Sequence, residues 1–226
     1  MEPDISISLR SNSGSARTML QAISESGVRS VQIDYLHEDF SDMSVSAYRD
    51  LASTLRRLGL RASGVDFLVP ATLWDEEPER TLLSLNSVVT MSTALGNVPI
   101  GTLIPEESEL ASSAKKITQQ SGVLLSAHGS TPPEDPQVGW HLPISLLVKE
   151  GRPIKKLVSS KCAPMAIRLR GEIVGDSTLE LGEYQVELRE LRGVLDAMRW
   201  KPTPIIDCHI EESSAIVRAW QIAGPW

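Results

Sequence analysis

Two residues at the ends of apolar runs have side chains that suit proton transfer. His128 closes the run SGVLLSAH, and Asp207 closes the run TPIID near the end of the chain. An imidazole titrates near neutral pH and a carboxylate can accept a proton, so both residues are candidate catalytic groups. His128 could instead bond a backbone carbonyl at the rim of the fold, and Asp207 could bond neighbouring loop amides. His209 follows Asp207 on the same face of a strand, because strand side chains alternate, and is a candidate ligand contact.

Arginines at the ends of two further runs suggest anion binding. Arg10 ends ISISLR, and the run PMAIRLR contains Arg168 and Arg170. A guanidinium that points into a core needs an anionic partner. The partner could be the carboxylate of Asp207, which would make a structural ion pair, or a phosphate or carboxylate of a ligand. We prefer the ion pair and keep all three arginines as candidate ligand contacts.

Acidic and amide side chains late in two other runs are candidate hydrogen-bond partners of a polar ligand. Gln32 and Asp34 end VRSVQID, and Asp66 lies late in LRASGVDFLV. Each could equally bond within the fold. Trp74 and Trp140 are expected on loops or strand ends, where an aromatic ring can stack on a sugar or simply cover the fold.

The elements that must position these side chains alternate between strand and helix patterns. Segments with apolar residues at helical spacing end at Gly27, Gly59, Gly96 and Gly122. These glycines recur about every thirty residues, the length of one strand and helix unit. The pattern predicts a parallel sheet closed into a (β/α)8 TIM barrel. The expected strands are 5–10, 28–35, 60–69, 98–104, 121–130, 138–142, 164–170 and 203–209.

The expected helices follow these strands, and two polar stretches are interpreted as loops. The loops are LHEDFSD and ATLWDEE, which precede the second and third long helical segments. The clearest amphipathic pattern in the second half covers 184–198. The expected helices are 16–27, 45–59, 82–96, 110–122, 144–158 with a break around Gly151 and Pro153, and 184–198, with a short closing helix at 216–222.

Composition limits the classes of function. The 226 residues include 22 Lys and Arg against 29 Asp and Glu, a formal charge of -7 that offers no general attraction for nucleic acid. Cys162 and Cys208 lack a metal-ligand spacing, and two free thiols fit a reducing compartment. Neither a signal peptide nor a membrane span is apparent. A single cytoplasmic domain over 1–226 is therefore expected, with its oligomeric state left open.

The sequence also resembles a known family over nearly its whole length. The segments GVRSVQID, LRASGVDFLVP and ALGNVPIGTLIP in the first half, and PMAIRLRG, GDSTLELGEY and PIIDCHI in the second, carry the likeness. They are similar to short members of the xylose isomerase-like superfamily of TIM barrels, which includes sugar-phosphate isomerases and epimerases and endonuclease IV-like enzymes. The resemblance implies the same barrel, with a site at the carboxyl ends of its strands.

The resemblance also implies a divalent metal, held by carboxylates and histidines at the ends of the later strands. The metal would orient a sugar hydroxyl and carbonyl while a carboxylate moves the proton. The matching positions here are Ser126, Leu142, Arg168 and Asp207. One carboxylate with one histidine, His128 or His141, is a poor set of ligands for a hard cation. No cofactor is therefore expected, and a divalent metal is disfavoured.

Together these features predict a barrel that resembles the sugar isomerases and epimerases and binds a small sugar or polyol derivative. His128 and Asp207 are the candidate proton-transfer groups. The alternative is a catalytically silent barrel that binds a metabolite or a protein partner, while an endonuclease is disfavoured by the acidic charge and the missing ligands. The candidate ligand contacts are Arg10, Asp34, Asp66, Arg168, Arg170 and His209.

Overall fold

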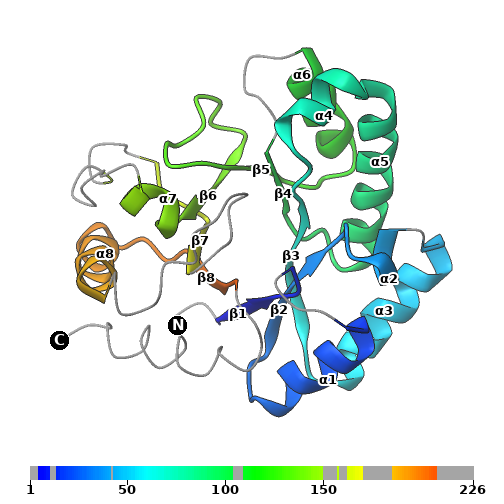
Figure 1. Ribbon diagram of the computed structural model, residues 1–226, viewed down its shortest axis with the longest axis horizontal. Helices are drawn as coiled ribbons and strands as arrows, with labels where there is room; N and C mark the ends of the chain where they lie inside the picture. The colour runs from blue at the N-terminus through cyan, green and yellow to red at the C-terminus, as the bar shows by residue number, and fades with distance from the viewer. Residues whose placement is uncertain are drawn as a thin grey trace.

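Eight parallel strands close into a barrel in which each strand pairs with its neighbours in the sequence (Figure 1). The computed structural model describes residues 5–10, 14–41, 43–103, 109–149, 157, 162–169 and 185–207. The last strand returns to the first, where Ser6 pairs with Ile205 and Ile7 with Ile206. The predicted (β/α)8 TIM barrel is confirmed. The strands are β1 (Ser6–Ser8), β2 (Ser30–Asp34), β3 (Arg61–Phe67), β4 (Ile100–Thr102), β5 (Leu125–His128), β6 (Gly139–Pro143), β7 (Ala166–Leu169) and β8 (Thr203–Ile206).

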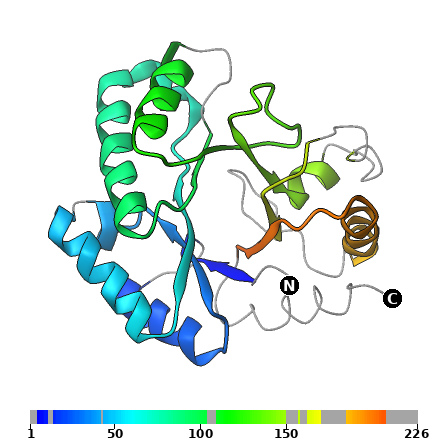
Figure 2. The same ribbon diagram turned by 180° about the vertical axis from the view of Figure 1, so that it is seen from behind.

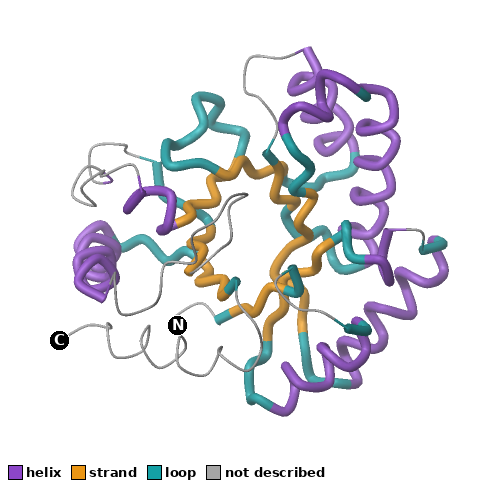
Figure 3. The backbone as a smooth tube through the Cα atoms, in the orientation of Figure 1, coloured by secondary structure: helices purple, strands orange, loops and turns teal. Residues whose placement is uncertain are grey.

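Helices pack around the outside of this ring of strands (Figure 3). Seen from behind, α1, α3, α5 and α6 line one side of the barrel, and α7 and α8 lie on the other (Figure 2). Residues 129–138 join β5 to β6 without a helix in their length. The helices are α1 (Ala16–Glu25), α2 (Glu38–Ser41), α3 (Val45–Arg57), α4 (Ala71–Glu76), α5 (Pro78–Ala94), α6 (Glu109–Gln120), α7 (Ile144–Lys149) and α8 (Gln185–Met198).

Two stretches that were expected to be loops contain short helices, so that interpretation was wrong. LHEDFSD includes α2, and ATLWDEE includes α4. Each helix buries one aromatic side chain, Phe40 in α2 and Trp74 in α4. A single buried ring can hold one or two helical turns against the barrel without the repeated apolar spacing that reveals a longer helix.

Capping serines and glycines set the ends of the longer helices, and the sequence predicted the glycines. Ser15 accepts a hydrogen bond from the Thr18 amide at the start of α1, and Ser44 accepts one from Ala47 at the start of α3. The four glycines that were expected to end helices all adopt positive φ, for example +68° at Gly59. This left-handed conformation is accessible to glycine at little cost, so it turns the chain toward the next strand.

Apolar side chains fill the layer between the strands and the helices. Strand residues such as Ile33 and Phe67 are buried there, together with the helical stripes of Met19, Leu20 and Ile23 in α1 and of Tyr48, Leu51 and Leu55 in α3. Alternate residues of the strands point the other way, into the barrel. The outer layer therefore supplies the main hydrophobic core.

The inside of the barrel is polar where many TIM barrels carry bulky aliphatic residues. Gln32 and Asp66 are buried there, and glycines lie beside them. A Cβ atom at Gly64 would lie 2.8 Å from Gln32 Nε2, and one at Gly101 would lie 2.7 Å from His128 Nε2. These glycines leave room for the polar side chains.

Some of the sequence predictions lie outside the described residues. These are the candidate contacts Arg170 and His209, Cys208, and the closing helix at 216–222. Among the helices that the structure describes, none combines the length and the apolar character that crossing a bilayer requires.

Candidate functional site

Asp66, near the end of β3, is the hub of the polar network inside the barrel. Its side chain is completely buried, and its Oδ1 accepts a hydrogen bond of 2.9 Å from Gln32 Nε2 on β2. The side-chain oxygen Oε1 of Gln32 in turn accepts a 2.8 Å hydrogen bond from Ser63 Oγ, and Ser63 Oγ lies 2.7 Å from Ser6 Oγ. The carboxylate is thereby fixed by a chain of bonds that reaches β1.

Arg168 on β7 joins Asp66 to Asp207 across the barrel. Its Nη2 contacts Asp66 Oδ2, and its Nη1 donates a 2.5 Å hydrogen bond to Asp207 Oδ2. All three side chains are at least nine-tenths buried. The preferred sequence interpretation, an ion pair between Arg168 and Asp207, is present, and Asp66 is a second partner that sequence analysis did not connect to it.

The two carboxylates keep this buried guanidinium charged. Burial alone would lower the pKa of Arg168, but attraction by Asp66 and Asp207, together with their hydrogen bonds, outweighs it and raises the pKa above its ordinary value. A buried charge is tolerated when it is paired and hydrogen-bonded in this way. Arg168 is therefore a permanent positive charge in the middle of the barrel.

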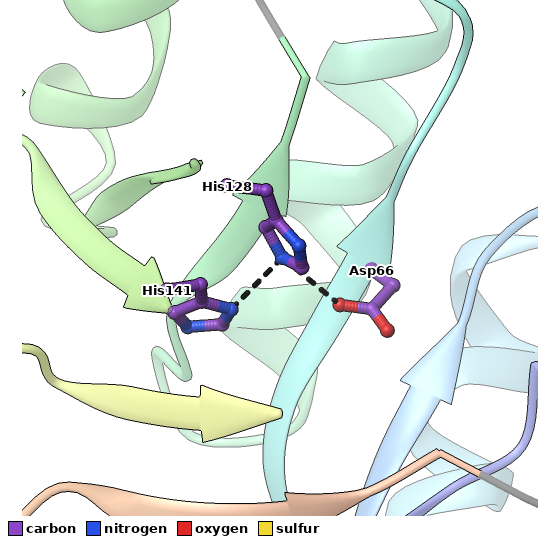
Figure 4. Close-up of side chains that lie close together, drawn as sticks. All are labelled: Asp66, His128 and His141. Carbon is purple, nitrogen blue, oxygen red and sulfur yellow. Dashed lines mark hydrogen bonds and ion pairs between the residues drawn. The ribbon is translucent and has the colours of Figure 1, made fainter. Parts of the chain in front are cut away.

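A pair of histidines lies beside this ion cluster. His128 at the end of β5 and His141 in the middle of β6 are register partners, and His141 Nδ1 lies 2.9 Å from His128 Nε2. Figure 4 shows the two rings and the carboxylate of Asp66 turned toward one another, with His128 Nε2 3.9 Å from Asp66 Oδ1. From the sequence, His141 was named only as an alternative to His128 in a poor set of metal ligands. The pairing of the two rings follows from the register of β5 and β6, which places His128 beside His141.

Both imidazoles are held in the neutral form. Burial, followed by repulsion from Arg168, lowers the pKa of His128 well below its ordinary value. The same two causes lower the pKa of His141 to about 3. A neutral imidazole has one N–H and one free lone pair, so one ring donates the hydrogen bond and the other accepts it. At pH 7 both rings are therefore neutral, and the pair can donate an N–H without carrying a positive charge.

Asp34, the last residue of β2, is an acid with a raised pKa. Its Oδ1 accepts a 3.1 Å bond from the Leu36 amide, and Asp34 is the register partner of Asp66 on β3. Burial, and then the negative charge of Asp66, raises the pKa of Asp34 to about 6, although the Leu36 bond and the charges of Arg10 and Arg168 act in the opposite direction. Asp34 therefore changes charge close to neutral pH.

Arg10 lies at the same end of the barrel as Asp34 and His128. Its positive charge lowers the pKa of both, which places it within electrostatic reach of them. Within the part of the chain that the structure describes, no carboxylate lies at ion-pair distance from its guanidinium. Arg10 thus differs from Arg168, whose two terminal nitrogens both contact protein carboxylates.

The two tryptophans do not present a ring face for a sugar, so that interpretation was wrong. Trp74 is fully buried, with its ring packed edge-on against Phe67 at a centroid distance of 5.9 Å. Trp140 is also buried, and its Nε1 donates a 2.8 Å bond to the Gly129 carbonyl. Both rings belong to the packing of the barrel wall.

Two buried polar groups of the interior are left without partners among the described residues. They are Arg168 Nε and Ser126 Oγ, the latter on β5 two residues before His128. Buried donors in native proteins nearly always find a partner, in the protein, in ordered water or in a ligand. These two groups can bond a polar molecule in the barrel.

The residues do not fit the divalent metal that the resemblance implies. Of the matching positions, Leu142 is apolar and buried, Ser126 is a hydroxyl, and Asp207 already bonds the guanidinium of Arg168. Asp66, His128 and His141 do bring three potential ligand atoms within 4.8 Å of one another. Asp66 is shared with Arg168, however, whose fixed positive charge repels a cation at these atoms.

Comparison with known proteins identifies the fold. No family model matches the sequence, and no curated protein matches it. A xylose isomerase domain protein from Planctomyces limnophilus superposes with a TM-score of 0.75 at 12% identity, over 98% of this chain and 96% of that one. The chain has the fold of the xylose isomerase-like TIM barrels. At this identity the likeness establishes the architecture and not the reaction.

Other barrels of this xylose isomerase-like fold differ in chemistry. The D-psicose 3-epimerase of Clostridium cellulolyticum H10, solved with D-tagatose, has a TM-score of 0.67 at 11% identity, over 97% of this chain and 96% of that one. The probable 3-DHS dehydratase AsbF of Bacillus anthracis has a TM-score of 0.69 at 12% identity, with 97% of each chain covered. The reaction must therefore be argued from this chain's own side chains.

Proposed function

We propose that this xylose isomerase-like barrel binds a small sugar or polyol derivative at the carboxyl ends of its strands and moves a proton on it. The observation that carries the proposal is the convergence, at this end of the barrel, of a neutral histidine pair, an acid with a pKa of about 6 and a buried guanidinium. Perturbed ionisable groups that converge in this way are typical of acid–base sites. The likeness to sugar epimerases agrees with this class of ligand.

The groups divide into complementary roles for an isomerisation or epimerisation. Asp34, mostly ionised at pH 7 with a pKa of about 6, accepts the proton from the carbon next to a carbonyl. The bonding electrons move onto the carbonyl oxygen, which takes the N–H proton of the neutral His128 ring. Asp34 returns its proton to carbon and a hydroxyl proton goes back to His128, so the reaction has no net change in composition. Arg168 stabilises the negative charge that develops on the oxygen.

Asp207 has a supporting role in this proposal. The sequence suggested it for proton transfer, but its carboxylate bonds the guanidinium of Arg168. It is assigned here to hold that guanidinium, together with Asp66. Arg10 lies near Asp34 with no described carboxylate partner, and it is the better candidate for an anionic group on the ligand.

Hydrogen exchange at carbon tests the proposal. The protein is incubated in D2O with D-tagatose, D-fructose, D-xylose and fructose 6-phosphate, and the C–H signals next to each carbonyl are followed by NMR. We expect exchange on at least one of these sugars. His128→Gln should slow it by about 100-fold or more, the usual contribution of a general acid–base group. Asp50→Asn, a change at an exposed carboxylate on α3, should leave the rate unchanged.

A binding protein without catalysis is the second candidate. It is favoured because the polar groups of the barrel largely satisfy one another: His128 with His141, and Arg168 with Asp66 and Asp207. Calorimetric titration with the same sugars separates the two functions. Binding without exchange supports the second candidate, and the absence of both contradicts the proposal.

A further inference from the structure

We infer that the guanidinium of Arg168 takes the place of a cation between Asp66 and Asp207, and that removing it opens a divalent-metal site. The site would be formed by these two carboxylates and by His128 and His141. The inference does not rest on the proposed function, because metal binding can be measured without any sugar.

The first argument is the balance of charge inside the barrel. Asp66 and Asp207 come from β3 and β8, and both carboxylates contact the same guanidinium. Asp66 is completely buried, and Asp207 is 5% exposed. Two buried carboxylates without a cation between them would repel each other and lack their solvation. Arg168 compensates this charge in the native protein.

The second argument is the set of donor atoms around Arg168. His128 Nε2 lies 3.9 Å from Asp66 Oδ1 and 2.9 Å from His141 Nδ1, so the imidazoles border the same carboxylate. Asp66, His128 and His141 already bring ligand atoms within 4.8 Å of one another, and Asp207 borders the space that the guanidinium would leave. Mixed nitrogen and oxygen donors of this kind suit zinc and cobalt better than magnesium or calcium.

The third argument explains why the native protein should not bind the metal. Arg168 contacts Asp66 directly, and both of its ion pairs are buried. A second cation at Asp66 or at the histidines would therefore lie within a few ångströms of a fixed positive charge in a poorly screened interior. The same field is the second cause, after burial, of the lowered pKa of His128 and His141.

The experiment compares the native protein with Arg168→Ala. Each protein is freed of metal with a chelator and titrated with Zn²⁺ by calorimetry, and with Co²⁺ by its visible absorption. We expect one ion to bind Arg168→Ala and to raise its thermal midpoint by about 5–10 °C at 100 times the dissociation constant. The native protein should bind no ion, and its thermal midpoint should be the same with and without the chelator.

Three control variants test the assignment of the ligands. Arg168→Ala combined with Asp207→Asn should lose the gained binding, because one carboxylate ligand is gone. Arg168→Lys keeps a positive charge at the position and should not bind the metal. Arg49→Ala removes an exposed arginine on α3 and should behave like the native protein.

Two results would overturn the inference. One is stoichiometric Zn²⁺ binding by the native protein that is lost on His141→Ala, since Arg168 would then not exclude the metal. The other is failure of Arg168→Ala to bind an ion. If that variant is unfolded after metal removal, Zn²⁺ added during refolding should restore its circular dichroism, and a variant that stays unfolded with Zn²⁺ also overturns the inference.

Discussion

At the scale of single residues, Asp34 links the site to the stability of the fold. Its pKa in the folded protein is raised from 3.8 to about 6, mainly by burial and then by Asp66. A raised pKa means that the folded state holds the proton more tightly than the unfolded chain. The contribution of Asp34 to stability is therefore present below about pH 4 and is lost as the pH rises through 6.

Asp34→Asn should remove this pH dependence, because an amide does not titrate and its oxygen can still accept the Leu36 bond. We expect the free energy of unfolding of the native protein, relative to this variant, to fall by roughly 2 kcal/mol between pH 4 and pH 7. Urea denaturation of both proteins across this range measures the difference. A difference that stays constant with pH would contradict the shifted titration.

Sequence reasoning found individual polar residues of the site and missed how they are joined. The pairing of Arg168 with Asp207 followed from the cost of burying an arginine next to an acid on the adjacent strand. Asp66 and Gln32 were recognised as late strand residues that could bond a ligand or another group of the fold, without a named partner. Their contacts run across the barrel, and the contact from Arg168 to Asp66 spans 102 positions in the chain. Alternation within one strand cannot reveal such a contact.

At the scale of elements, the glycines of the barrel wall make the polar interior possible. A Cβ atom at Gly101 on β4 would lie 2.7 Å from His128 Nε2 and 3.0 Å from Asp66 Oδ1. Gly101→Ala should therefore push the His128 ring and the Asp66 carboxylate out of place. The expected cost is about 1–3 kcal/mol of stability, typical of overpacking, together with loss of any sugar binding.

A second glycine provides the matched comparison. Gly193 lies inside α8, and a Cβ atom there would meet nothing within 4 Å. Gly193→Ala should be neutral or stabilise the protein by up to about 1 kcal/mol, since alanine favours helix. Denaturation curves of the two variants give both values. Equal changes in stability for the two variants would mean that the barrel accommodates a Cβ atom at Gly101 without displacing His128 or Asp66.

The long helices, α7 and all eight strands followed from their sequence patterns, and the short helices α2 and α4 did not. A stripe of apolar residues and a closing glycine identify α3, because the pattern repeats over several turns. Four residues in α2 and six in α4 are too few to show a repeat. Their helical form depends on the burial of Phe40 and Trp74 against the barrel, which only the folded structure supplies.

At the scale of the whole molecule, the polar network ties opposite parts of the barrel together. Bonds run from Ser6 on β1 through Ser63, Gln32 and Asp66 to Arg168 on β7 and Asp207 after β8. The number of strands indicated a barrel, and the family resemblance supported its closure. The network that crosses the inside depends on the register between strands, which neither composition nor periodicity determines.

Because one side chain joins β3, β7 and β8, its loss should be felt in all three strands at once. We expect Arg168→Met, which keeps the volume and removes the charge, to accelerate amide hydrogen exchange by about 10-fold or more in 61–67, 166–169 and 203–206. The outer helix α3 should change less, since its packing does not involve Arg168. Exchange followed by mass spectrometry resolves these segments, and Arg49→Ala is the control. Acceleration confined to 166–169 would show that Arg168 acts only on its own strand, whereas a coordinated change would show that a single buried arginine couples distant strands of the barrel.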